Sequence, residues 1–120
     1  NLYYHQQKDE ARRRAGHFIR ERLPKYLGYF EEVLAANGSG RRYMIGRAPT
    51  YVDLSMFQLI AGLRYAFPNA MRRRVRSFPG LIGVHDRIAA RPRVAAYLAS
   101  PRRIPFNESG IFRHYPELDA

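Results

Sequence analysis

The stretch TYVDLSMFQLIAGLRYAF, residues 50–67, decides the fold of this chain. Its apolar side chains leave little room for a polar face, which is typical of a helix in the middle of a core. Thr50 and Asp53 form a T-x-x-D pattern, a variant of the capping box, in which each side chain accepts a hydrogen bond from the other residue's backbone N–H. The carboxylate also lies favourably at the positive end of the helix dipole. We therefore predict a buried central helix from Thr50 to Phe67, with Thr50 and Asp53 as its structural N-capping box.

The segment before it, residues 6–36, has the pattern of a long amphipathic helix. Its apolar residues recur at steps of three and four, which places them on one stripe. Pro24 interrupts this pattern, because it lacks a backbone N–H and crowds the carbonyl of Arg20. Since the stripe continues on both sides of Pro24, we predict one helix with a kink there.

Shorter helices are predicted after the central one. Turn signals at 37–40, 68–69 and 78–80 mark the breaks between helices. The patterns predict helices over 69–76 and 80–90, and a last one from Pro92 with Val94, Tyr97 and Leu98 facing inward.

The segment from Pro101 onward has no helical periodicity, but it keeps large apolar side chains. A disordered tail would carry fewer of them, so we expect this one to pack across the body of the domain. Strands are not expected, because no segment alternates apolar and polar residues for long. The predicted fold is all-α: one domain, residues 1–120, with a helical bundle around a central buried helix and an irregular C-terminal tail.

Composition limits the chemistry that the chain can support. It has no cysteine, which excludes a disulfide, a thiolate metal site and a cysteine nucleophile. It has no run of the ~20 apolar residues needed to cross a bilayer, so we expect no membrane partner.

The formal net charge of +11 has three interpretations. Arginine clusters at 12–14 and 72–76 could bind nucleic acid, but no base-reading motif accompanies them. An acidic partner domain outside this chain is the second possibility. We favour the third, solvated helix faces, and do not expect nucleic acid as a partner.

The polar residues indicate no self-sufficient catalytic site. The four histidines are far apart and show no metal-ligand spacing, so no metal is expected, and His85 suits a packed face. Glu31 and Glu32 are interpreted as solvated ion pairs. Asp53 could be a buried functional acid, but the capping role fits it better. No phosphate-binding loop and no nucleophile elbow are present, and Tyr26 and Tyr29 are expected in the core or an interface.

The residues around the central helix resemble a known family. Tyr43-Met44-Ile45-Gly46, residues 47–49 and the Thr50–Leu54 box are similar to the signature of the C-terminal domain of cytosolic glutathione transferases. Residues 22–31 look like the second half of that domain's long kinked helix, and residues 78–81 and 89–98 look like its next two helices. The resemblance covers about the whole chain, and we assign a bacterial-type member.

The resemblance implies an enzyme whose chemistry lies outside this chain. Family members join a thioredoxin-like domain, which binds most of the glutathione co-substrate and carries a thiol-activating Tyr, Ser or Cys, to a helical domain. We expect that domain and the first helix of the helical domain to be absent from this chain, which alone would be inactive. The full-length protein is expected to conjugate glutathione to hydrophobic electrophiles in the cytoplasm, as a homodimer.

Phe112 and Tyr115 are the residues that the resemblance suggests for the electrophile pocket, because the family's C-terminal tail contributes to it. A hydrophobic anchor for the tail is the alternative role for both. The alternative for the whole chain is a non-catalytic interaction module of the same fold, for which the basic surface would be suitable.

Overall fold

The computed structural model of this chain describes residues 2–38 and 40–120, so the predicted turn at 37–40 falls partly outside the described residues. These residues form helices without a strand, which confirms the all-α prediction. The helices are α1 (Lys8–His17), a π-helical turn (Phe18–Arg22), α2 (Leu23–Ala36), α3 (Tyr51–Ala66), α4 (Pro68–Arg74), α5 (Pro79–Ala89) and α6 (Pro92–Leu98). Short 3₁₀ turns lie at Tyr4–Gln6, Val75–Ser77 and Pro116–Leu118.

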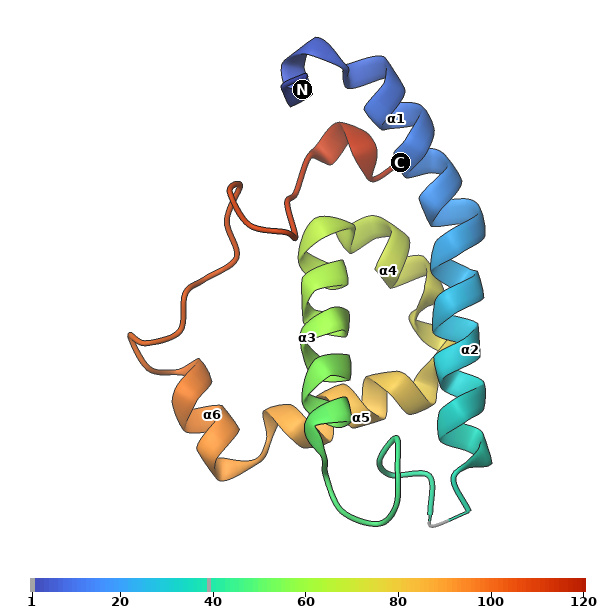
Figure 1. Ribbon diagram of the computed structural model, residues 1–120, viewed down its shortest axis with the longest axis vertical. Helices are drawn as coiled ribbons and strands as arrows, with labels where there is room; N and C mark the ends of the chain where they lie inside the picture. The colour runs from blue at the N-terminus through green and yellow to red at the C-terminus, as the bar shows by residue number, and fades with distance from the viewer. Residues whose placement is uncertain (1, 39) are drawn as a thin grey trace.

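One helical rod runs along the length of the molecule and consists of α1, the π-helical turn and α2 (Figure 1). The prediction of one continuous helix is therefore confirmed, and the effect of Pro24 takes the form of a π turn just before it. In this turn the Leu23 N–H donates to the carbonyl of Phe18, five residues back. A proline offers no N–H to the carbonyl four residues before it, so a locally wider turn accommodates it.

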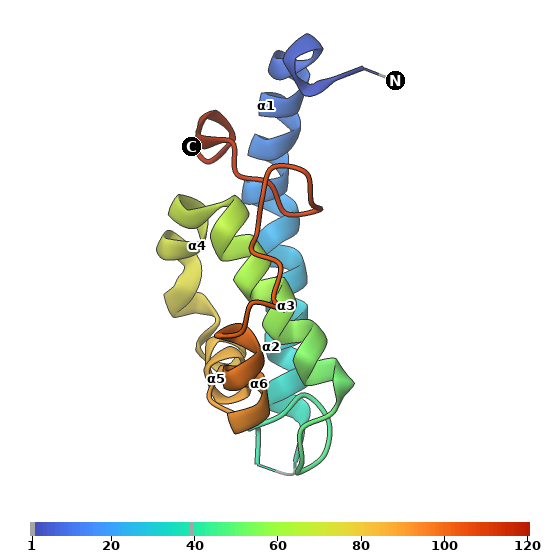
Figure 2. The ribbon, with the colours of Figure 1, turned by 90° about the vertical axis from the view of Figure 1, so that its left-hand side faces the viewer.

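Helix α3 lies beside this rod, with α5 crossing its lower part and the tail returning along its other side (Figures 1 and 2). The core that these elements share contains fully buried Ile60 of α3 and Leu81, Val84 and Ile88 of α5. Leu27 of α2 completes it with 1% exposure. One stripe of α3 is open, however, because Tyr51 and Leu54 are exposed.

The start of α3 is held by a carboxylate with no exposed surface. Asp53 Oδ2 accepts a hydrogen bond from the Thr50 N–H at 2.8 Å, and Oδ1 accepts one from the Met44 N–H at 2.8 Å. The Thr50 hydroxyl accepts from the N–H of Val52 at 3.3 Å. Asp53 thus both caps the helix and ties the preceding loop to it.

Two further carboxylates cap helices from a distance. Glu31 of α2 accepts from the N–H groups of Gly80 and Leu81, at 2.7 and 2.9 Å, in the first turn of α5. Asp119 of the tail accepts from the N–H groups of Asn69 and Ala70, at 2.7 and 2.9 Å, in the first turn of α4. Our interpretation of Glu31 as part of a solvated ion pair is therefore wrong. Its carboxylate accepts hydrogen bonds from the N–H groups that have no partner within α5, and its negative charge lies at the positive end of the α5 dipole.

The tail and the surface tyrosines differ in part from the sequence predictions. Phe112 and Tyr115 are half-buried, as a tail packed on the body requires, but Ile104 is 80% and Ile111 96% exposed. Tyr97, predicted to face inward, is 44% exposed. Tyr26 and Tyr29 are also exposed, on the outer side of α2, so neither lies in the core.

We predict that Asp53→Ala lowers the free energy of unfolding by about 3 kcal/mol, because it leaves the Met44 and Thr50 N–H groups without an acceptor. Thr50→Ala, which removes only the local cap, should cost about 1 kcal/mol. Urea unfolding measures both values. Asp9→Ala is the control, since Asp9 is an exposed acid in the first turn of α1. Equal losses for Asp9→Ala and Asp53→Ala would contradict the structural role of Asp53.

Candidate functional site

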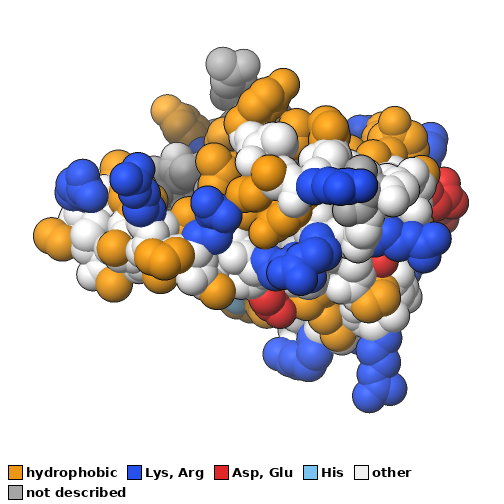
Figure 3. All heavy atoms as spheres, turned by 90° about the horizontal axis from the view of Figure 1, so that it is seen from below, with side chains coloured by type: hydrophobic (Ala, Val, Ile, Leu, Met, Phe, Trp, Pro, Cys, Tyr) orange, Lys and Arg blue, Asp and Glu red, His pale blue; other side chains and the backbone are white. Residues whose placement is uncertain are grey.

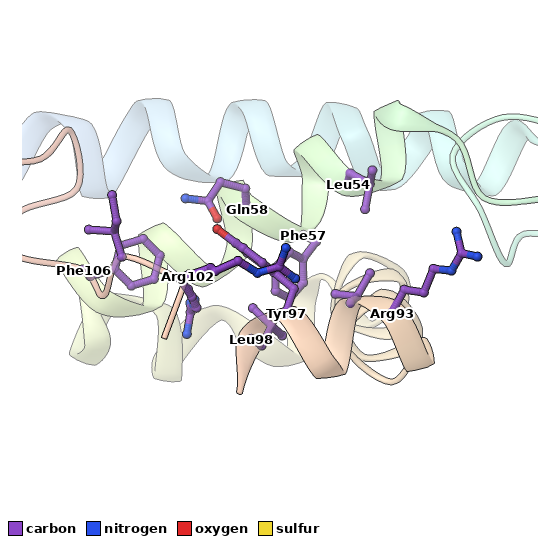
Figure 4. Close-up of a pocket in the computed structure, with 11 residues that line it drawn as sticks. Leu54, Phe57, Gln58, Arg93, Tyr97, Leu98, Arg102 and Phe106 are labelled. Atoms are coloured by element: carbon purple, nitrogen blue, oxygen red, sulfur yellow. The ribbon is translucent and has the colours of Figure 1, made fainter. Parts of the chain in front are cut away.

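An apolar pocket of about 460 Å³ lies between α3, α6 and the first part of the tail. Figure 4 shows that α3 contributes Leu54, Phe57 and Gln58 to it, while Tyr97 and Leu98 come from α6. The full lining is Leu54, Phe57, Gln58, Arg93, Val94, Tyr97, Leu98, Arg102, Arg103, Ile104 and Phe106. Such a cavity, apolar with a few polar groups, is typical of sites that receive an apolar group.

The charges around this pocket are all positive. Arg93, Arg102 and Arg103 line it, and in Figure 4 Arg93 extends away from the other labelled side chains. The Arg103 guanidinium lies 5.6 Å from the centre of the Phe106 ring, a cation–π contact that holds both side chains at the pocket. None of the described lining residues is an acid, a histidine or a serine, so the pocket can bind but has no general base or nucleophile of those types.

Phe112 does not line this pocket but supports its wall. Its ring lies against Gly62 of α3, where a β-carbon would overlap it. It also meets Phe106 edge-to-face, with ring centres 5.9 Å apart. Phe106 in turn stacks on Tyr65 at 5.1 Å, so the tail is held on α3 by a chain of aromatic contacts.

Tyr115 lies at a different place, next to the N-terminal segment. It stacks on Tyr4 with ring centres 4.0 Å apart. A second hollow of about 420 Å³, which we call the Tyr115 hollow, is formed there by Leu2, Tyr3, Tyr4, Gln7, Ala11, Arg14, Arg113 and Tyr115. The structure therefore does not bring Phe112 and Tyr115 together in one cavity, and their role as substrate-binding residues stays a prediction.

The Tyr4 hydroxyl donates a hydrogen bond to the carboxylate of Glu117. This bond raises the pKa of Tyr4 to about 12 and lowers the pKa of Glu117, with Lys8 and Arg12 adding to the second effect. Tyr4 is thereby kept protonated well above neutral pH, so it acts as a hydrogen-bond donor and not as a base.

The sequence reasoning missed the apolar pocket. Leu54 and Tyr97 carried the same apolar signal as their buried neighbours, and only the packing of α6 and the tail shows which side stays open. His85, predicted on a packed face, is half-buried and stacks on Phe57 at 4.9 Å. Across the described residues, no group of three histidines or acids is placed to hold a metal ion. No helix formed by those residues is long and apolar enough to cross a membrane.

Comparison with known proteins identifies the fold. The family model described as the C-terminal domain of glutathione S-transferase matches residues 1–101. The chain belongs to this family. It is a glutathione S-transferase C-terminal domain, as the residues around the central helix predicted.

Curated relatives carry the same family name over part of their length. A glutathione S-transferase of Plasmodium yoelii yoelii is 34% identical over 83 residues, which are 69% of this chain and 37% of that protein. Glutathione S-transferase P 1 of Bufo bufo is 31% identical over 90 residues, 73% of this chain and 41% of that protein. The domain thus spans about two fifths of the length of these relatives. The bacterial-type assignment stays a prediction.

We predict that Gly62→Ala destabilises the domain by about 2 kcal/mol, because the new methyl group would overlap the Phe112 ring and displace the tail. Gly28→Ala in α2 is the matched control, since a β-carbon at Gly28 meets nothing within 4 Å. The control should raise stability by about 0.5–1 kcal/mol through helix propensity. Thermal unfolding measures both changes, and a stabilising Gly62→Ala would contradict the tight tail contact.

Proposed function

We propose that the protein to which this domain belongs is a glutathione transferase that conjugates glutathione to hydrophobic electrophiles in the cytoplasm. The observation that carries this proposal is the family match over residues 1–101, together with relatives that are named glutathione S-transferase. In this proposal a thioredoxin-like domain outside the chain activates the thiol by stabilising its thiolate near neutral pH. The helical domain contributes structure and part of the hydrophobic-substrate site.

The cavities of this domain support a protein in which one domain binds glutathione and the other contributes apolar surface. Its apolar pocket and the Tyr115 hollow are lined by aromatic and aliphatic side chains together with five arginines and two glutamines. Such linings suit an apolar electrophile or an apolar protein surface better than a charged tripeptide. Glutathione is therefore bound mainly by the thioredoxin-like domain in this proposal, and no metal takes part.

We assign the apolar pocket between α3, α6 and the tail to the contact with the thioredoxin-like domain. Leu54 is 48% exposed, Tyr97 44% and Ile104 80%, so apolar side chains of the pocket are open to solvent. An exposed apolar patch of this kind marks an interaction site. The relatives are more than twice as long as the part that this chain matches, so they contain a segment that could cover it. A homodimer of the full-length protein belongs to the same proposal.

The electrophile site is assigned to the tail. Tyr115 lines the hollow next to the N-terminal segment, and its hydroxyl-bearing ring stacks on Tyr4. Phe112 holds the tail on α3, where its ring packs against Gly62. Between Phe112 and Tyr115, His114 also contacts α3, because its Nδ1 lies 3.1 Å from the Ala66 carbonyl oxygen. Tyr115 would contact the electrophile, and Phe112 would fix the tail that carries it.

The assay of the full-length protein with glutathione and an activated aryl chloride tests these assignments. We expect turnover, and we expect none from the 120-residue chain alone. Tyr115→Ala should raise the KM for the aryl chloride about tenfold, the loss expected for one aromatic contact, and leave the KM for glutathione unchanged. Leu54→Glu should lower both turnover and melting temperature, because it places a charge in the interface between the domains.

Matched variants control for unrelated effects. Tyr26→Ala removes an exposed tyrosine of α2, and Ile45→Glu adds a charge at an exposed position outside the pocket. Both should behave like the wild type. A full-length protein without any conjugation activity would support the non-catalytic interaction module instead. An unchanged electrophile KM in Tyr115→Ala would remove Tyr115 from the substrate site, while the transferase assignment would stand on the turnover itself.

A further inference from the structure

A third hollow, of about 530 Å³, differs from the two described above because four of its ten lining residues are arginines. It lies between α1 with the π-helical turn, α4 and the last residues of the tail, near the upper end of the molecule in Figure 1. Four arginines line it, Arg12 and Arg20 from one side and Arg73 and Arg74 from the other. The remaining lining residues are Gly16, Ile19, Ser77, Glu117, Leu118 and Ala120. We call it the arginine hollow.

Two of the guanidinium groups lie close to other parts of the chain at this hollow. The Arg20 side chain folds back along the helix over Gly16, with Nη1 2.9 Å from the place where a β-carbon of residue 16 would lie. On the opposite side, Arg73 Nη2 donates to the backbone carbonyl of Ala120 at 2.8 Å, and Arg74 is half-buried. Arg73 is therefore held by a hydrogen bond to the tail, and Arg20 lies along the helix over Gly16.

The positive charge of the arginine hollow is only partly balanced by the residues that line it. Glu117 is the one carboxylate side chain among the described lining residues, so it offsets one of the four positive charges while it also accepts from the Tyr4 hydroxyl. Asp119 does not line the hollow, and its carboxylate accepts from the N–H groups at the start of α4. Within the described part of the chain, the ion pairs are Arg13 with Glu10 and His85 with Asp86, and neither involves this hollow.

Helix stability alone does not account for this arrangement. Arg73 and Arg74 lie in the last turn of α4, where cations interact favourably with the helix dipole. Arg12 and Arg20 have no such role toward α4, yet they face it across the hollow. Like charges brought together in this way repel each other, and a multivalent anion between them would remove that cost.

We propose that the arginine hollow binds a small anion with two adjacent phosphate groups. Planar guanidinium groups bind phosphate oxygens in pairs, and two arginines from each side match two phosphates. The Ser77 hydroxyl adds a neutral donor to the same lining. A volume of about 530 Å³ lies within the range of small-molecule sites.

The surroundings favour a small phosphate compound over a nucleic acid. No aromatic side chain is among the described residues that line the arginine hollow, so it lacks the platform on which bases stack. At the opposite end of the molecule, Figure 3 shows basic side chains spread among hydrophobic ones, with few acidic ones. The arginines of the apolar pocket, Arg93, Arg102 and Arg103, likewise lie among mostly apolar lining residues.

Isothermal titration of the full-length protein with inorganic pyrophosphate, and separately with ADP, tests this proposal. We expect saturable binding to one site per chain for at least one of the two, weaker at higher salt. Tighter binding of ADP would indicate an organic diphosphate, and similar binding of both would indicate recognition of the diphosphate alone. The double variant Arg20→Gln/Arg73→Gln, with one change on each side, should bind at least about tenfold more weakly because it loses charge-assisted hydrogen bonds.

Arg47→Gln/Arg91→Gln is the matched control, with the same change in net charge at two exposed arginines outside the arginine hollow. It should bind as the wild type does, and circular dichroism checks that both double variants are folded. Single Arg12→Gln and Arg74→Gln variants repeat the test should the first double variant unfold. Absence of saturable binding, or an equal loss in the control, would overturn the proposal. Binding of an RNA oligonucleotide without binding of either diphosphate would also overturn it, in favour of a polyanion surface.

Discussion

The backbone N–H groups at the starts of α3, α4 and α5 have no partners within their own helices, and three carboxylates supply the acceptors. Asp53, Asp119 and Glu31 each accept two backbone N–H bonds of 2.7–2.9 Å. Asp53 is fully buried and Asp119 is 3% exposed, so neither bond pair can be replaced by water without opening the fold. These contacts are more directional than the apolar core around them, and they decide which segments meet.

Each carboxylate connects a helix to another part of the chain, and together they position the candidate sites. Asp53 fixes the loop before α3, and Glu31 fixes α5 against the long rod. Asp119 anchors the end of the tail on α4, so the tail is held at its far end while the aromatic contacts of Phe106 and Phe112 hold its middle on α3. The apolar pocket and the Tyr115 hollow both depend on this course of the tail, because tail residues line each of them. The last residues of the tail also line the arginine hollow.

The sequence predicted those features whose determinants are close together along the chain. The apolar run of α3, the box formed by Thr50 and Asp53 and the breaks between helices are local patterns, and the resemblance to the glutathione transferase domain was built on them. The links from Glu31 to Gly80 and from Asp119 to Asn69 join residues 49 and 50 positions apart, so no local pattern indicates them. Glu31 consequently looked like one more solvated acid. Tyr97 was placed on the wrong side because a seven-residue helix has an ill-defined apolar stripe. The sequence also did not predict the π turn before Pro24, because a helix can accommodate a proline in several ways.

Native-state hydrogen exchange of the Met44, Ala70 and Leu81 amide protons is the most direct measurement of the central claim. Amides in loops and in the first turn of a helix ordinarily exchange fast, because they have no partner inside the helix. If the three carboxylates organise the fold, these amides should exchange as slowly as the core amides of α3 and α5, through global unfolding. Fast exchange at these three positions, with slow exchange confined to helix interiors, would contradict the account and leave the apolar core alone as the organiser of the domain.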